Sequence, residues 1–118
     1  MKIALDYDGT YTEDKAFWLD FINQAQKSGH KVFVVTYRHP LLDTIPDEKP
    51  IRNFGVPVIY TDGHPKKAYC ESQDILIDVW IDDRPQTVYE PSPWQDGDPR
   101  LTEWRENNRK ASMEVYNG

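Results

Sequence analysis

The sequence predicts an α/β protein built around a parallel β-sheet. Four short apolar segments alternate with helical patterns over the first 84 of its 118 residues. Helical connections between consecutive strands are typical of parallel sheets with right-handed crossovers. The second strand segment is apolar on both faces, which indicates burial between two layers. We therefore expect one domain over residues 1–118, with its core in 1–84.

The first half of the chain contains two of these strands and one long helix. "MKIALDY", residues 1–7, predicts a short buried strand. Apolar side chains recur at helical spacing from Phe17 to Ala25, with Thr12 as the expected N-cap and Gly29 as the stop. "KVFVVTY", residues 31–37, is rich in β-branched residues and predicts the second strand.

The next elements follow the same alternation. Three prolines in residues 39–50 exclude one continuous helix, so we expect a loop and then a short helix near Asp47 to Phe54. "VPVIYT" predicts a third strand, and Pro65 lies near the start of the helix that follows it. "ILIDVWID", residues 75–82, predicts the fourth strand.

The remainder, residues 85–118, differs in composition from the core. "PQTVYEPSPWQDGDP" is rich in Pro, Asp and Gly and predicts an irregular segment. "RLTEWRENNRKASMEVY", residues 100–116, predicts a C-terminal helix.

Composition narrows the classes of function. The formal charge of −6 argues against a non-specific nucleic-acid binder, which would need a basic face. Cys70, the single cysteine, excludes an intramolecular disulfide framework and fits a reducing cytoplasm. No apolar run approaches the ~20 residues that span a membrane, and no signal peptide is evident, so we expect a cytoplasmic protein with no membrane partner.

Polar residues gather where the four predicted strands end, and parallel topology brings such ends to one rim. They are Asp6 and Asp8, then Thr36 and Arg38, then Lys66 and Lys67, and finally Asp82, Asp83 and Arg84. Because Asp6 and Asp8 alternate with Tyr7, an extended chain would point both carboxylates the same way. Two like charges held so close need a cation or a shared proton. Lysine at a helix N-terminus likewise indicates a nearby anion.

Phosphoryl transfer through an aspartate is the chemistry that uses this set. Asp6 is the expected nucleophile and Asp8 the general acid and base. Mg²⁺ would be held by Asp6, by the backbone carbonyl of Asp8, and by Asp82, Asp83 or both. Thr36 and the backbone N–H groups of Gly9 and Thr10, just after Asp8, would bind the phosphoryl oxygens. Lys66 or Lys67 would offset the charge, and Arg38 and Arg84 are candidates for a second phosphate contact.

Four stretches, "DYDGT", "VVTYR", "PKK" and "WIDD", resemble the four motifs of the haloacid dehalogenase superfamily, in the same order. This resemblance implies a three-layer Rossmannoid fold with sheet order 3-2-1-4 and a Mg²⁺-dependent phosphatase activity. It also implies that Asp83, Asp82 or both complete the metal site, and we favour Asp83 as the direct ligand with Asp82 as its support. Lys66, which follows Pro65 at the helix start, is favoured over Lys67 for the third motif.

The chain has no room for the cap domain that usually selects substrates in this superfamily. Open sites there resemble those acting on macromolecular phosphates, or those that borrow a lid from a second subunit, here a homo-oligomer. "WIDDRPQTVY" is also similar to polynucleotide 3′-phosphatase domains, which makes a nucleic-acid 3′-phosphate an alternative substrate. A catalytically silent relative that binds a partner through the same fold is the other alternative.

Overall fold

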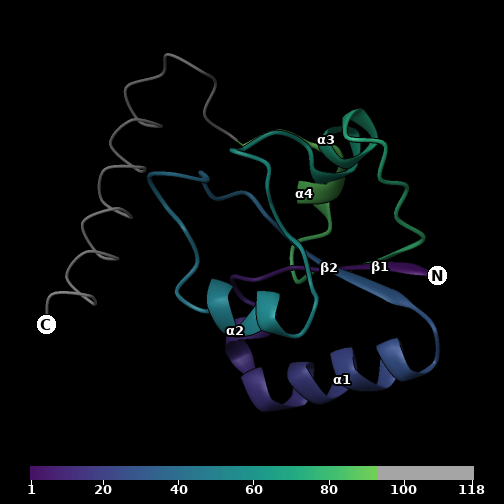
Figure 1. Cartoon of the computed structure of the whole chain (residues 1–118). Helices are drawn as coiled ribbons and strands as arrows, with labels where there is room; N and C mark the ends of the chain where they lie inside the picture. The colour runs from purple at the N-terminus through teal and green to yellow at the C-terminus, as the bar shows by residue number, and fades with distance from the viewer. Residues whose placement is uncertain (93–118) are drawn as a thin grey trace, which may run out of the picture.

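The computed structural model describes residues 1–92, which form a four-stranded parallel sheet of order β3-β2-β1-β4 (Figure 1). The strands are β1 (Lys2–Leu5), β2 (Lys31–Thr36), β3 (Val58–Tyr60) and β4 (Val79–Ile81). The predicted α/β class and the strand order are both confirmed.

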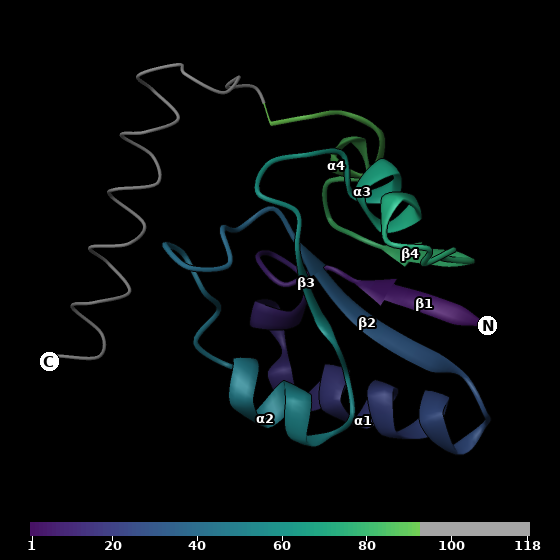
Figure 2. The same ribbon diagram turned by 45° about the horizontal axis from the view of Figure 1, so that its top comes forward.

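The helices cover both faces of this sheet. They are α1 (Lys15–Lys27), α2 (Glu48–Asn53), α3 (Lys66–Ser72) and α4 (Gln86–Tyr89), with a 3-10 turn, η1 (Tyr11–Glu13), before α1. Figure 2 shows α1 and α2 below the sheet and α3 and α4 above it, so the described residues form three layers. The arrangement is Rossmann-like.

Alternate side chains of the central strands supply the cores of the two layers. Leu5, Val34 and Ile22 are fully buried in the core on the α1 side. Ala4 packs with Val35 and Cys70 in a smaller cluster on the α3 side. Burying each of the larger aliphatic side chains is worth about 1.5–3 kcal/mol. Double-sided burial explains why these strands are apolar throughout.

Several element boundaries differ from the sequence predictions. Asp14, not Thr12, caps α1, because its Oδ1 accepts a 3.1 Å hydrogen bond from the N–H of Phe17. The strand predicted over residues 75–82 is shorter, from Val79 to Ile81. The segment predicted to be irregular after Arg84 begins with the short helix α4, which Pro85 precedes. Local pattern had underestimated this helix because proline favours helix starts as well as loops.

The predicted C-terminal helix, residues 100–116, lies outside the described residues. Within residues 1–92, no helix is long and apolar enough to cross a membrane.

Candidate functional site

The site begins where β1 ends. Asp6 still pairs with β4, since its N–H donates to the carbonyl of Ile81 at 2.9 Å. The chain then turns: the N–H of Tyr11 donates to the carbonyl of Asp6, and Gly9 adopts a positive φ of 84°. This turn leaves Asp6 7% exposed at the carboxyl edge of the sheet.

Lys66, the first residue of α3, connects the ends of two strands. Its Nζ lies 2.7 Å from Oδ1 of Asp6 and 2.6 Å from Oδ2 of Asp82, and only 2% of the residue is exposed. The ammonium also lies 5.5 Å from the centre of the Tyr37 ring. Lys67 instead lies on the surface over Tyr89. The structure therefore brings Lys66, and not Lys67, to the acidic residues.

Thr10 joins Asp6 to the second aspartate after β4. Its hydroxyl lies 3.2 Å from Oδ2 of Asp6 and 3.3 Å from Oδ1 of Asp83, and it accepts from the N–H of Asp83 at 3.2 Å. Gly9 allows this approach, since a Cβ there would meet Oδ2 of Asp83 at 2.4 Å. We call Asp6, Thr10, Lys66, Asp82 and Asp83 the Lys66 cluster.

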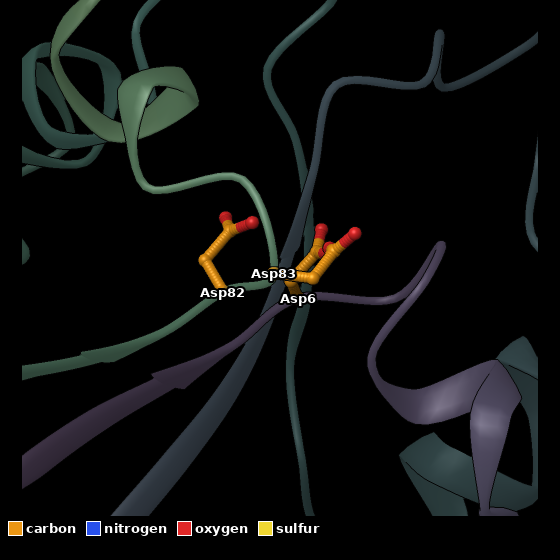
Figure 3. A group of neighbouring side chains, drawn as sticks. All are labelled: Asp6, Asp82 and Asp83. Atoms are coloured by element: carbon orange, nitrogen blue, oxygen red, sulfur yellow. The ribbon is translucent and has the colours of Figure 1, made fainter.

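Three carboxylates of the Lys66 cluster could hold a metal ion. Asp6, Asp82 and Asp83 each offer an oxygen, and these oxygens lie within 4.8 Å of one another. Figure 3 shows the three side chains directed to the same side from the ends of β1 and β4, with those of Asp6 and Asp83 next to each other. Carboxylate oxygens are the donors that hard divalent cations such as Mg²⁺ prefer.

The three aspartates differ in how many protein donors contact their carboxylate oxygens. Oδ1 of Asp82 accepts from the N–H of Arg84, and Oδ2 accepts from Lys66 and from the hydroxyl of Thr87. Asp82 therefore has more protein donors against it than Asp6 or Asp83. Asp6 and Asp83 keep more free acceptor capacity, because Thr10 has a single hydroxyl proton to give to either of them.

Burial raises the pKa of the Asp6 carboxyl from 3.8 to about 7, Lys66 opposes this rise, and the hydrogen bond with Asp83 adds to it. Without a cation, two adjacent carboxyl groups share a proton more readily than they both ionise. The sequence analysis expected such repulsion between two neighbouring carboxylates at the end of the first strand. The structure shows that the neighbouring carboxylate of Asp6 is that of Asp83 and not that of Asp8.

Asp8 makes its side-chain contacts with Arg38. Its two carboxylate oxygens accept from Nε and Nη2 of Arg38, at 2.9 and 2.8 Å. The expectation of an extended chain from Asp6 to Asp8 is wrong, because β1 ends at Leu5 and Asp8 lies in the turn that follows. Arg38 also contacts Asp43, with Nη1 3.2 Å from Oδ1. We call Asp8, Arg38 and Asp43 the Arg38 cluster.

The remaining predicted site residues lie at the same edge with other contacts. Thr36 is buried at the end of β2, and its hydroxyl accepts from the N–H of Arg38 at 3.3 Å. The N–H of Gly9 donates to the hydroxyl of Thr12, so it is engaged within the turn. Arg84 is exposed beside Asp83.

Three residues with clear contacts at this edge were missed by sequence analysis. Thr87 binds Asp82 from α4, Tyr37 covers Lys66, and Asp43 pairs with Arg38. Tyr37 follows Thr36 directly and could have been noticed as the last residue of the predicted strand. Thr87 and Asp43 carry no local signal, since their roles depend on how loops return to the sheet edge.

Comparison with family models, curated proteins and solved structures finds no match for this chain. The fold and the site therefore define its class: a Rossmann-like parallel α/β protein with an acidic cluster at the strand ends that could hold a metal ion.

Proposed function

We propose that the protein is a Mg²⁺-dependent phosphomonoester hydrolase that works through an aspartyl-phosphate on Asp6, as its resemblance to the haloacid dehalogenase superfamily implies. The observation that carries the proposal is the buried contact of Lys66 with both Asp6 and Asp82, next to Asp83. A lysine held there neutralises part of the charge that three carboxylates and a phosphoryl group would bring together.

The donor set of the Lys66 cluster fits magnesium. Asp6 and Asp83 would be its direct protein ligands, because Asp82 already accepts from Lys66, Thr87 and the N–H of Arg84. Asp82 would support the site by orienting Lys66. When bound, Mg²⁺ supplies charge neutralisation and orientation of the phosphoryl group.

The reaction has two displacements at phosphorus. In the first, a carboxylate oxygen of Asp6 forms a bond to phosphorus, the ester P–O bond breaks, and the leaving oxygen takes a proton from Asp8. In the second, Asp8, now ionised, takes a proton from water as the water oxygen attacks phosphorus. The bond from phosphorus to Asp6 breaks, which releases inorganic phosphate and restores the Asp6 carboxylate.

The connections next to this site are short. Between Asp6 and α1 the chain makes only the turn and η1, and between β2 and β3 it makes a loop and α2. Such short connections leave little chain to cover a small substrate. They favour a substrate whose phosphate is carried on a macromolecule, or a site that a second copy of the chain completes. Exposed Arg84 and half-buried Arg38 stay candidates for contacts with that phosphorylated substrate.

Release of inorganic phosphate from p-nitrophenyl phosphate tests the proposal. We expect turnover that requires Mg²⁺ and that is abolished by Asp6→Asn. Asp20→Asn, on the exposed face of α1, is the matched control and should keep full activity. The absence of turnover by the intact protein on nucleotides, sugar phosphates, phosphopeptides and 3′-phosphorylated oligonucleotides would overturn the proposal in favour of a binding protein.

A further inference from the structure

We propose that Arg38 is a positioning residue for Asp8, which it holds in the orientation that the proton transfers require. This inference rests on the proposed function, since it concerns how the acid and base of that reaction is aimed. It is carried by the paired contacts of the Arg38 guanidinium with both carboxylate oxygens of Asp8.

The backbone of Asp8 is fixed by its turn, but its side chain is not. Hydrogen bonds from the N–H groups of Thr10 and Thr12 to the carbonyl of Tyr7 close the turn around Asp8. The Asp8 side chain is 54% exposed, and the contacts that fix it come from Arg38. An exposed aspartate without such a partner samples several rotamers, and a misdirected proton donor costs rate.

Arg38 is itself held rigidly from three sides. Its Nη1 donates to Oδ1 of Asp43 and to the carbonyl of Thr44, both at 3.2 Å. Its guanidinium carbon lies 5.4 Å from the centre of the Tyr7 ring. Because the planar fork has a fixed geometry, anchoring one edge of the guanidinium also fixes the other edge, which holds Asp8.

The paired contact leaves part of the Asp8 carboxylate unoccupied. A carboxylate offers about four lone-pair sites, and the two N–H groups of Arg38 use two of them. One site on each oxygen stays free, and the side chain is exposed to solvent. Arg38 thus restricts the direction of the Asp8 carboxyl without blocking it.

The dependence of the rate on the leaving group distinguishes positioning of Asp8 by Arg38 from a purely structural role of Arg38. We would measure kcat/KM for p-nitrophenyl, phenyl and p-methoxyphenyl phosphates, because a general acid matters most for the most basic leaving group. We expect Arg38→Gln to lower kcat/KM for the p-methoxyphenyl ester about 10-fold more than for the p-nitrophenyl ester, a part of the 10²–10⁴-fold that acid–base catalysis supplies. Asp8→Asn should likewise lower kcat/KM most for the most basic leaving group. The double variant with Arg38→Gln should show the same dependence on the leaving group as Asp8→Asn alone.

Tyr7→Phe is the matched control. The hydroxyl of Tyr7 donates to Oδ2 of Asp47 at 2.5 Å, so it connects the same two loops without touching the Asp8 carboxylate. We expect it to change all three rates by one common factor. Arg38→Lys keeps a cation beside buried Asp43 but cannot make the paired contact, so it should show the steeper dependence and serves if Arg38→Gln fails to fold.

Equal losses on all three esters in the folded Arg38 variants would overturn the inference and would indicate a contact with the substrate phosphate or a bracing role. That result leaves the proposed function standing, because the wild-type protein would still turn over each ester. No turnover by the wild type would instead overturn the proposed function.

Discussion

Two charged clusters lie at the same edge of the sheet, and they differ in burial and in what they connect. The Lys66 cluster joins β1 to α3 and β4, and its Lys66, Asp6 and Asp82 side chains are buried. The Arg38 cluster is half-buried and joins the turn after β1 to the loop after β2. One places a lysine between two hidden carboxylates, whereas the other places an arginine between a hidden carboxylate and an exposed one.

This difference suits the two clusters to different roles in the proposed reaction. Buried charges are costly to leave unpaired, so Lys66, Asp6 and Asp82 hold one another in place, which suits the metal ion and the nucleophile of the proposed reaction. The Asp8 side chain, by contrast, is 54% exposed and reaches solvent. A nucleophile in the Lys66 cluster and a proton carrier in the Arg38 cluster is the arrangement that the proposed reaction needs.

Removing the lysine should have the largest effect. Lys66→Met leaves the buried carboxylates of Asp6 and Asp82 without their cation, so we expect a loss of about 3–5 kcal/mol in the free energy of unfolding. Urea denaturation measures it. Lys67→Met is the matched control and should change stability by no more than about 0.5 kcal/mol, because Lys67 lies on the surface. Equal losses in the two variants would contradict the structural distinction between these lysines.

Removing the arginine should cost less. Arg38→Met deprives Asp43, 2% exposed, of one ionic partner, and we expect a loss of about 1–3 kcal/mol in the free energy of unfolding. Asp8→Ala removes only the exposed partner and should cost about 0–1 kcal/mol. The same urea titration measures both variants. A larger loss for Asp8→Ala than for Arg38→Met would show that the exposed end dominates this cluster.

Alanine substitutions at two glycines distinguish the cost of backbone strain from the effect of a clash with the Lys66 cluster. Gly9 and Gly29 have similar positive φ values, 84° and 86°, so alanine at either position should cost about 1–2 kcal/mol. A Cβ at Gly29 meets nothing within 4 Å, whereas a Cβ at Gly9 collides with Asp83. We therefore expect Gly9→Ala alone to weaken Mg²⁺ binding, by about 10- to 100-fold in a calorimetric titration. Equal Mg²⁺ affinities in the two variants would remove Asp83 from the metal site.

The smallest effect concerns the contact that braces the Arg38 loop. Burial opposes ionisation of Asp47, but hydrogen bonds from Tyr7 and Lys15 and the charge of Lys15 outweigh it and lower the pKa of Asp47 below 3.8. A carboxyl whose pKa is lowered by folding stabilises the protein above its unfolded pKa, and this contribution is lost as pH falls through the folded pKa. The stability difference between wild type and Tyr7→Phe should thus be constant above about pH 5 and shrink below about pH 4. Urea midpoints from pH 3 to 7 measure it, and a difference that grows on acidification would contradict this assignment.

Periodicity and composition were sufficient to predict the four strands and their order along the chain, because each strand is a short apolar segment between helical connections. They were less reliable at boundaries. The start of α1 depends on the side-chain cap of Asp14, and α4 depends on contacts that include the bond from Thr87 to Asp82. Neither of these hydrogen bonds follows from a repeating sequence pattern.

For the candidate site, the sequence by itself determined which residue types reach the carboxyl edge, since a parallel sheet delivers every strand end to one side. Only the tertiary structure decided the pairing among them. Lys66 rather than Lys67 enters the core because α3 begins there with one face toward β1 and β4. Asp8 turns to Arg38 because the chain leaves the strand after Leu5, and a turn has no fixed alternation from which its direction could be read.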